Sequence, residues 1–269
     1  MRSHLWLAFV CCVILFVVGC TPAIPEETGP APHVYFCPQD HCNDILAKYI
    51  TSSTVKDCAF YAVNEPPVIT GLTSARVVAD ADNQITGLAA HYDNRPAFMH
   101  NKFCVLDTGI ITGSYNPTTS GADDYNNLLF IPSKHLRTLY EAEFSELWTN
   151  HFGTGTKTKQ PMLRYNNYSI TVLFCPEDAC KKTVEKYLQE ATRSIEFMTF
   201  SFTEEDLSRL LIQKHQQGVA VRGVMEGQRK TMQYEQYTPL KDAGIPIALE
   251  NTGALLHHKV FIVDGRIVS

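Results

Sequence analysis

One pattern occurs twice in this sequence and constrains the fold more than any other feature: a histidine, a lysine two residues later, and an aspartate five residues after the lysine. The two copies are His100, Lys102 and Asp107, and His257, Lys259 and Asp264. Each copy lies in an apolar run that is typical of a strand. Because side chains on a strand alternate between its faces, the histidine and the lysine of each copy project from the same face. Each copy therefore places a nucleophile or base beside a positive charge, which suits a phosphate group.

The duplication extends to the segments that precede the two patterns. Residues 33–36 and 170–174 are expected to be strands, and each leads into a Cys-Pro turn and then an amphipathic helix, over 42–50 and 180–191. A further strand follows in both halves. Strands that alternate with helices indicate an α/β fold with a mixed, largely parallel sheet. We therefore expect two similar lobes related by a pseudo-twofold axis, which would bring the two histidines together.

The two halves differ in the middle. In the second half, a capped helix is expected after Phe200, and a strand over 219–226. The corresponding residues 64–69 of the first half contain Pro66 and Pro67, so a helix is not expected there.

These patterns define a plan for the whole chain. It consists of a signal peptide (1–19), a Pro-rich tether (20–32), a first lobe (33–150), a linker (151–165) and an incomplete second lobe (166–269).

The amino terminus is typical of an export signal. A short basic segment precedes an apolar run over 5–18, which ends in small residues just before Cys20. This ending resembles a bacterial lipobox, in which the cysteine sulfur receives a diacylglyceryl group. We expect an exported lipoprotein anchored to a membrane through Cys20; ordinary secretion and an uncleaved anchor are the alternatives.

Six of the nine cysteines lie beyond the expected signal peptide and Cys20, and they fit an oxidising compartment. Four of them lie in two similar local pairs, Cys37 with Cys42 and Cys175 with Cys180. Each pair could close a small loop as a disulfide, remain as two thiols, or bind a metal, although the spacing is longer than zinc prefers. The other two, Cys58 and Cys104, lie in apolar runs and are expected in the core.

The repeated pattern, together with Gly113-Ser114 and Asn116 after its first copy, resembles the phospholipase D superfamily. The resemblance implies phosphodiester chemistry without a metal or cofactor. One histidine would attack phosphorus to form a phosphohistidine, and the other would protonate the leaving group and then activate water. The lysines would hold the phosphoryl oxygens, and Ser114 and Asn116 would bind phosphate.

Some roles remain open at this level. We expect His100 to be the nucleophile because its half carries the more complete motif. Asp107 and Asp264 could take part in the chemistry or hold turn amides. The mechanism further implies one neutral and one protonated histidine in the resting enzyme, and so a bell-shaped dependence of the rate on pH.

Three departures from the family pattern stand out. The interval between Asp107 and Gly113 is one residue short, which indicates a tight hairpin. Asn126-Asn127 replaces a glutamate that many members carry, so a group that could orient a histidine is neutral. The sequence ends at Ser269, before a second Gly-Ser-x-Asn would be expected.

Three functions compete. A phospholipase D would cut phospholipids at a membrane surface, as the expected lipid anchor favours. A nuclease would use the same chemistry, and the compact lobes resemble the small bacterial endonucleases of the superfamily. The formal charge of −5 and the lack of a basic run with interleaved aromatic residues oppose it. An inactive surface lipoprotein that acts as a binding module is the third.

Overall fold

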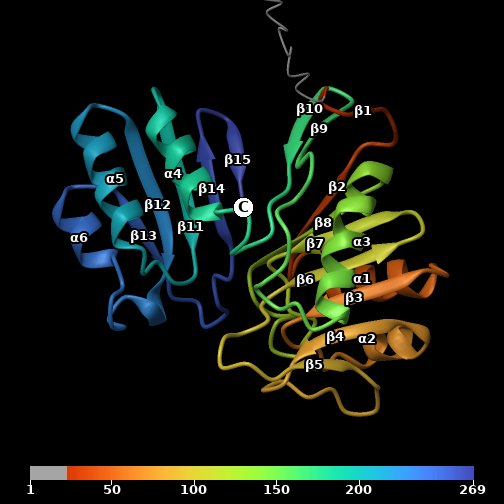
Figure 1. Ribbon diagram of the computed structural model, residues 1–269. Coiled ribbons are helices and arrows are strands. Elements are labelled where there is room, and N and C mark those ends of the chain that lie inside the picture. Colours follow the sequence, from red (N-terminus) through yellow and green to blue (C-terminus); the bar gives the residue numbers. More distant parts are fainter. Residues whose placement is uncertain (1–22) are drawn as a thin grey trace, which may run out of the picture.

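The computed structural model describes residues 23–269, which form two α/β lobes and a small sheet beside the first lobe (Figure 1). The expected signal peptide and Cys20 lie outside the described residues. The helices of the described part are α1 (Cys42–Thr51), α2 (Pro66–Gly71), α3 (Lys134–Trp148), α4 (Cys180–Glu190), α5 (Glu205–Gln216) and α6 (Tyr237–Asp242), with 3₁₀ turns η1 (Leu72–Ser74) and η2 (Gly227–Arg229). None of these helices is long and apolar enough to cross a membrane.

The first lobe contains a seven-stranded sheet in the order β2-β8-β7-β6-β3-β4-β5. Its strands are β2 (His33–Cys37), β3 (Lys56–Phe60), β4 (Arg76–Asp80), β5 (His91–Asp93), β6 (Lys102–Leu106), β7 (Gly109–Gly113) and β8 (Asn126–Ile131). Strands β3, β4 and β5 are parallel, and the other neighbours are antiparallel.

The second lobe contains a five-stranded sheet in the order β13-β12-β11-β14-β15. Its strands are β11 (Ser194–Thr199), β12 (Ala220–Glu226), β13 (Ile247–Glu250), β14 (Lys259–Val263) and β15 (Arg266–Val268). The order and directions repeat those of β5-β4-β3-β6-β7. The prediction of two similar α/β lobes is therefore confirmed, although antiparallel pairing is more extensive than expected because β6, β7 and β8 follow one another as hairpins.

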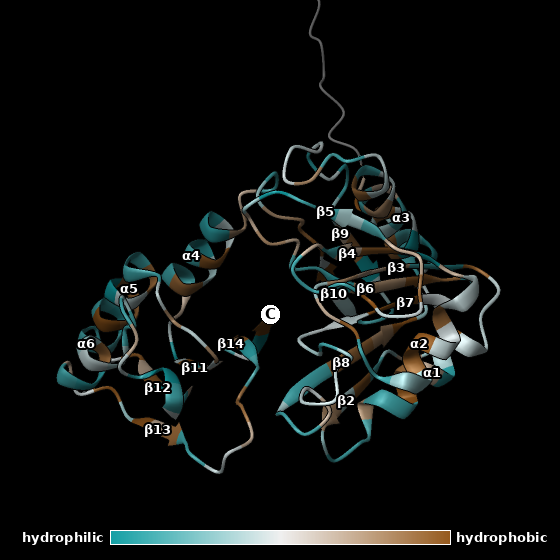
Figure 2. Ribbon diagram, turned by 90° about the horizontal axis from the view of Figure 1, so that it is seen from below, coloured by the Kyte–Doolittle hydropathy of each residue, from teal (hydrophilic) through white to brown (hydrophobic). Residues whose placement is uncertain are grey.

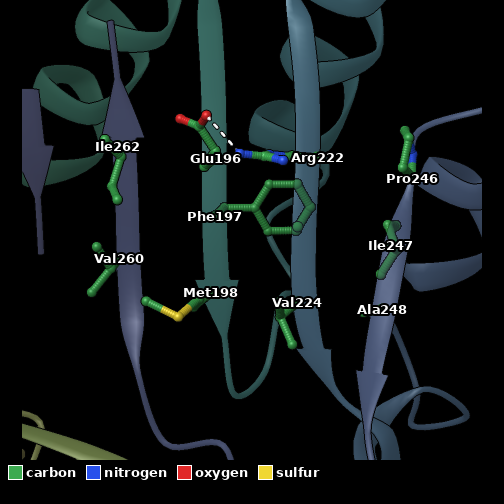
Figure 3. A pocket seen from close by; sticks show the side chains of 11 residues that line it. Glu196, Phe197, Met198, Arg222, Val224, Pro246, Ile247, Ala248, Val260 and Ile262 are labelled. Atoms are coloured by element: carbon green, nitrogen blue, oxygen red, sulfur yellow. Dashed lines mark hydrogen bonds and ion pairs between the residues drawn. The ribbon is translucent and has the colours of Figure 1, made fainter. Parts of the chain in front are cut away.

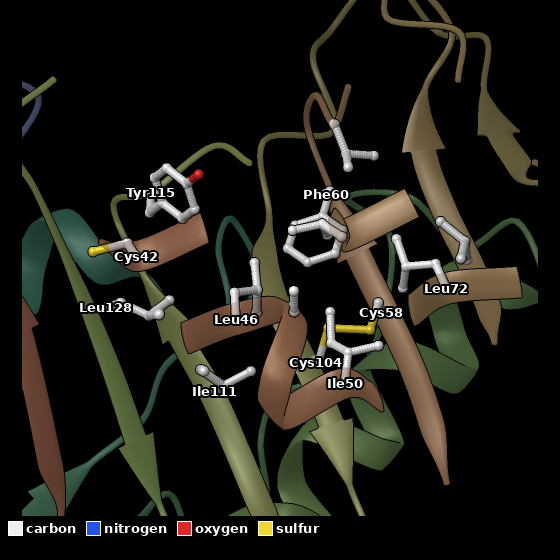
Figure 4. Packing of buried hydrophobic residues seen from close by; sticks show 14 of the residues in the cluster. Cys42, Leu46, Ile50, Cys58, Phe60, Leu72, Cys104, Ile111, Tyr115 and Leu128 are labelled. Carbon is white, nitrogen blue, oxygen red and sulfur yellow. A yellow bond between two sulfur atoms is a disulfide. The ribbon is translucent and has the colours of Figure 1, made fainter. Parts of the chain in front are cut away.

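Helices cover both faces of the first sheet (Figure 2). Helices α1 and α2 pack on one face, where Leu46, Ile50 and Leu72 surround the buried Cys58–Cys104 disulfide (Figure 4). On the other face lies α3, which the N-cap residue Ser133 precedes, and the side chain of Ser133 accepts a hydrogen bond from the Leu136 amide. The apolar stripe of α3 consists of Leu136, Leu139, Tyr140, Phe144 and Leu147.

The structure contains three disulfides in its described residues. Two join the local pairs for which a disulfide was one of three alternatives, Cys37–Cys42 and Cys175–Cys180. The third joins Cys58 to Cys104, which face each other across β3 and β6. Both were expected in the core, and both are fully buried. Their bond was not foreseen because it depends on the strand register.

Part of the predicted tether is folded, which corrects the sequence interpretation. Strand β1 (Glu26–Glu27) pairs with β9 (Met162–Tyr165) inside the predicted linker. The Glu27 carboxylate accepts hydrogen bonds from the Ser133 hydroxyl and from the amides of Lys134 and His135, at the start of α3. A carboxylate is favoured there because the first amides of a helix lack partners inside it.

Two further segments differ from expectation. The strand expected over 170–174 is β10 (Tyr168–Thr171), which pairs with β9 rather than with the second sheet. Pro66 and Pro67 begin the short helix α2 instead of preventing a helix, because the first helical position needs no amide hydrogen.

The second sheet has one face without a helix on it among the described residues. Helices α4 and α5 pack on the opposite face. The open face forms a shallow depression of about 640 Å³, in which Met198, Val224, Val260 and Ile262 lie side by side (Figure 3).

Candidate active site

The strand register brings the two repeated patterns to equivalent places in the two lobes. Lys102 begins β6 and is the partner of Phe60, the last residue of β3. Lys259 begins β14 and is the partner of Thr199, the last residue of β11. Each lysine and the histidine before it thus lie where the parallel strands of their sheet end.

The two lysines are held in the same way. The Lys102 ammonium donates a hydrogen bond of 2.9 Å to the backbone oxygen of His100, and Lys259 donates one of 2.8 Å to that of His257. Lys102 Nζ also lies 3.2 Å from each ring nitrogen of His100. Burial lowers the pKa of both lysines to about 7, and for Lys102 the charge of Lys259 adds to this. The two ammonium groups therefore lie close enough to repel each other, and an anion would relieve the repulsion.

A strap of backbone hydrogen bonds joins the lobes beside His257. The Tyr125 amide donates to the Leu255 oxygen and the His257 amide donates to the Tyr125 oxygen, both at 2.9 Å. The Leu255 amide also donates to the Asp124 carboxylate at 2.8 Å. This strap, residues 124–125 with 255–257, holds the second histidine against the first lobe.

Groups of the first lobe orient the ring of His257. Its Nδ1 lies 3.0 Å from the backbone oxygen of Ser114 and 2.9 Å from Oδ1 of Asn126. A backbone oxygen can only accept, so Nδ1 carries the hydrogen and Nε2 faces the site. Asn126 also accepts from the Ser114 hydroxyl at 2.9 Å. Asn126 thus orients the histidine without a charge.

An aromatic ring lies against each histidine, and the sequence interpretation missed both rings. The centroid of Tyr61 lies 4.7 Å from that of His100, and Phe200 lies 4.9 Å from His257. Lys102 and Lys259 lie over the same rings, at 5.4 and 5.3 Å. Both rings directly follow an inner strand, β3 or β11, so an alignment of the two halves could have indicated them.

The surroundings of both imidazoles favour the neutral form, whereas the sequence implied one neutral and one protonated histidine. Desolvation, together with the charges of Lys102 and Lys259, lowers the pKa of His100 to about 4. Desolvation and the same two charges lower the pKa of His257 to about 3, although its bond to Ser114 opposes the shift. A bound anion would raise the histidine pKa values, because it offsets the charges of the two lysines.

The two aspartates lie away from the chemistry, which corrects their assignment as catalytic. The Asp107 carboxylate accepts from the Thr54 amide. Asp264 accepts from the amides of Thr192, Arg193 and Ser194 just before β11, and these bonds lower its pKa well below the ordinary value. Each aspartate therefore fastens the far end of its strand to the neighbouring strand, as the structural alternative proposed. The hairpin that follows Leu106 is tight, as expected, since Gly109 pairs with Leu106.

The two residues expected to bind phosphate differ in placement. Ser114 lies beside the site, but its hydroxyl donates to Asn126 and accepts from the Asn127 amide. It therefore positions the Asn126 side chain rather than offering a free hydrogen. Oδ1 of Asn116 is buried and has no hydrogen-bond partner among residues 23–269.

A cavity of about 270 Å³ lies between the lobes, and His257 adjoins it through its contact with Ser114. His100, Lys102, Ser114, Lys259 and Phe174 are among the residues that line it. Across the described part of the chain, no three His, Cys, Asp or Glu side chains gather as a metal site would require. The arrangement provides two imidazoles and two lysine side chains at a space that could admit a phosphate group.

These features define a two-lobed α/β protein with a phosphate-directed histidine and lysine site. A family model described as "Cardiolipin synthase, PLD-like domain" matches residues 70–148 and 184–269, more than half of the chain. The protein belongs to this phospholipase D-like family.

Curated relatives match shorter stretches. A mitochondrial cardiolipin hydrolase from Chlamydomonas reinhardtii is 33% identical over 82 residues, which are 30% of this chain and 37% of the relative. A phospholipase D from Rickettsia prowazekii is 22% identical over 98 residues, which are 36% of this chain and 48% of the relative. Each match thus spans less than half of the relative's length.

The fold extends to solved structures of low sequence identity. A phosphatidylserine synthase from Haemophilus influenzae superposes with a TM-score of 0.61 at 9% identity and covers 86% of this chain and 76% of that structure. The likeness confirms the two-lobed fold.

Proposed function

We propose that this protein is a metal-independent phosphodiesterase that hydrolyses phospholipids to phosphatidic acid and a head-group alcohol. The observation that carries the proposal is the pairing of equivalent His and Lys side chains from two lobes at one cavity, which His100 and both lysines line and which His257 adjoins through Ser114. Nucleophile, proton donor and cations are the groups that the reaction needs.

In the first step, a ring nitrogen of neutral His100 attacks phosphorus, and the bond from phosphorus to the head-group oxygen breaks. His257, protonated once the anion is bound, gives its Nε2 proton to the leaving alkoxide. In the second step, His257 takes a proton from water, the resulting hydroxide attacks phosphorus, and the bond to His100 breaks. The products are phosphatidic acid and the free alcohol, and both histidines return to their starting state.

The surroundings of the two rings support this division of roles. Nδ1 of His257 faces two oxygen acceptors, from Ser114 and Asn126, which stabilise an imidazolium and so favour proton transfer. His100 faces the Lys102 ammonium, which favours a neutral ring with a free lone pair. Lys102 and Lys259 would hold the non-bridging oxygens as negative charge develops on them.

Two observations favour a phospholipid over a nucleic acid as the substrate. The similar proteins carry the names cardiolipin hydrolase and phospholipase D. The formal charge of −5 gives little general attraction for a polyanion. The expected anchor at Cys20, which lies outside the described residues, would add a third reason, because it would place the site at a membrane.

The test uses the full chain in the presence of EDTA with phosphatidylcholine and, separately, single-stranded DNA. His100→Ala serves as the inactive control. Release of choline above the control supports the proposal. DNA cleavage alone would identify a nuclease, and activity equal to the control on both substrates would identify a binding module. Loss of choline release on adding EDTA would contradict the metal-independent mechanism.

A further inference from the structure

Large apolar side chains are exposed on loops next to both catalytic histidines. Phe98 is 61% exposed on the loop between β5 and β6. Met232 and Tyr234 are 47% and 72% exposed on the loop that follows β12 and η2. Single exposed apolar residues are common on proteins, so their position relative to the site decides whether they matter.

In the first lobe, a short chain of contacts joins Phe98 to the site. Its ring meets Tyr61 edge-on at 5.6 Å, and Tyr61 lies 4.7 Å from the ring of His100. Phe98 is thus one side chain further out than the ring that contacts the histidine.

In the second lobe, an aromatic ring again contacts the histidine, and a cation joins that ring to the exposed loop. Phe200 lies against His257, and the Arg229 guanidinium lies 4.3 Å from the centroid of Phe200. Arg229 in turn contacts the sulfur of Met232 at 2.9 Å. Arg229 is half-buried here, while its neighbour Lys230 is exposed.

The loop is fastened in a way that directs Tyr234 outward. Tyr234 has a φ of 68°, a left-handed conformation that is unfavourable for a bulky residue. The Gln236 side chain donates to the Tyr234 oxygen at 2.7 Å, and the Glu235 carboxylate accepts from the Phe202 amide at 2.9 Å. The acidic group therefore faces the protein and the aromatic ring faces solvent.

We propose that Phe98, Met232 and Tyr234 form an apolar rim that enters the boundary between head groups and acyl chains of a phospholipid layer. The inference rests on the proposed function and specifies how its substrate is reached. Phe and Tyr side chains favour this boundary, and Arg229 and Lys230 would meet the phosphate groups around it. Both loops lie at the strand ends that carry the site, so insertion would present a head-group phosphate to both histidines.

The first experiment compares the same reaction in two physical states of the substrate. The full chain is assayed on phosphatidylcholine vesicles containing phosphatidylglycerol and on monomeric dihexanoylphosphatidylcholine. Phe98→Ser and Tyr234→Ser are each expected to lower the vesicle rate about tenfold and leave the monomer rate within about twofold. Tyr168→Ser, which removes an equally exposed ring from β10, is the matched control and should change neither.

Equal losses of the vesicle rate and the monomer rate would contradict the proposed role of the rim, because they would assign these side chains to the active site itself. Unchanged vesicle rates would overturn it as well. So would a loss confined to single-stranded DNA cleavage, which would indicate that bases stack on the rim.

A second measurement separates the rim from the proposed function. Tyr234→Trp and Tyr168→Trp are made in the His100→Ala background, and the fluorescence of each is measured with vesicles of brominated phosphatidylcholine. Quenching at position 234 beyond that at 168 and in the His100→Ala parent supports the rim even without turnover. Equal quenching at both positions would contradict it. Failure of the unmodified chain to hydrolyse the monomeric lipid would instead count against the proposed function.

Discussion

The two lobes build the same central strand pair with different chemistry. In the first lobe, Cys58 and Cys104 face each other across β3 and β6 and are joined by a disulfide. At the equivalent register in the second lobe, Phe197 faces Phe261, with ring centroids 6.2 Å apart. A covalent bond and an aromatic contact thus occupy the same place. The two lobes thus share the strand pairing and the position of the histidine and lysine, but different side-chain interactions stabilise the paired strands.

An ion pair at equivalent positions in the two lobes shows what a covering helix contributes to its strength. Asp57 and Arg76 are neighbours on β3 and β4, and Glu196 and Arg222 are neighbours on β11 and β12. Arg76 makes two bonds to its partner and lies 5.0 Å from Phe144 of α3. Arg222 is 72% exposed and reaches its partner only at 3.5 Å (Figure 3). In the first lobe, the Phe144 ring packs against Arg76 and stabilises the ion pair. In the second lobe, Arg222 is exposed to solvent, which weakens the pair.

The largest expected effect tests whether the two halves of the site have different roles. His100→Ala and His257→Ala should each lower kcat by about 10⁴-fold, because each removes a group that takes part in every turnover. After denaturation in mildly alkaline detergent, in which a phosphohistidine survives, label from a phosphorus-labelled substrate should remain on His257→Ala and be absent from His100→Ala. Label retained only by His100→Ala would reverse the assignment.

The next effect concerns stability. Replacing Cys58 and Cys104 by alanine should lower the free energy of unfolding of the first lobe by about 4 kcal/mol, because the disulfide spans 46 residues. Replacing Cys37 and Cys42, which are five residues apart, should cost about 2 kcal/mol. Urea unfolding of each variant measures both. A larger loss from the shorter pair would contradict this account.

The pH dependence tests whether the two lysines are equivalent. Each has a pKa of about 7 in the empty site, so the protonated form that holds phosphate is lost as pH rises through 7. We expect kcat/KM to fall about 100-fold or more between pH 7 and 9, and to fall again below about pH 4 as His100 is protonated. Because a bound anion raises the lysine pKa values, kcat should fall at higher pH than kcat/KM. A kcat/KM that stays constant to pH 9 would exclude the lysine role.

A smaller effect tests the contact between the lobes at His257. Asn126→Ala removes an acceptor from Nδ1 of His257 and from the Ser114 hydroxyl, and should lower kcat about 10- to 100-fold. Asn127→Ala is the matched control, because its side chain contacts His258 instead. Asn126→Asp should retain activity and raise the pKa of His257, which the alkaline side of the pH profile would report because His257 acts in its protonated form. Equal losses in the two alanine variants would indicate a merely structural effect.

The smallest effects compare the two ion pairs. Arg76→Ala should cost about 2 kcal/mol of unfolding free energy, because it leaves the buried Asp57 without its partner and uncovers Phe144. Arg222→Ala should cost about 0.5 kcal/mol or less, as is usual for an exposed pair. Comparable costs would show that α3 does not strengthen the pair.

The sequence was sufficient for the features that recur at fixed spacing. The repeat predicted two α/β lobes and the histidine and lysine pairs, and it offered the two local disulfides as one alternative, because each depends on residues near one another in the chain. The site then depends on a contact between residues 131 positions apart, Asn126 and His257, which spacing within either motif cannot specify.

The errors have physical reasons of the same kind. Glu27 appeared to be part of a tether because its partners, at the start of α3, lie more than 100 residues away. Asp107 and Asp264 appeared catalytic because they belong to the motif, yet each lies at the opposite end of its strand from the lysine. The charge state of the histidines followed from desolvation and two nearby lysines, which only the folded site brings together.

The strap between Tyr125 and Leu256 also bears on how a gene of this kind can change. A newly duplicated gene has two interchangeable halves. In this protein, Asn126 of the first half contacts His257 of the second half. A half exchanged with another gene would therefore have to carry residues that can form the same strap. Recombination would then tend to preserve the two halves as one inherited block, even while their interiors diverge as far as a disulfide and a pair of phenylalanines.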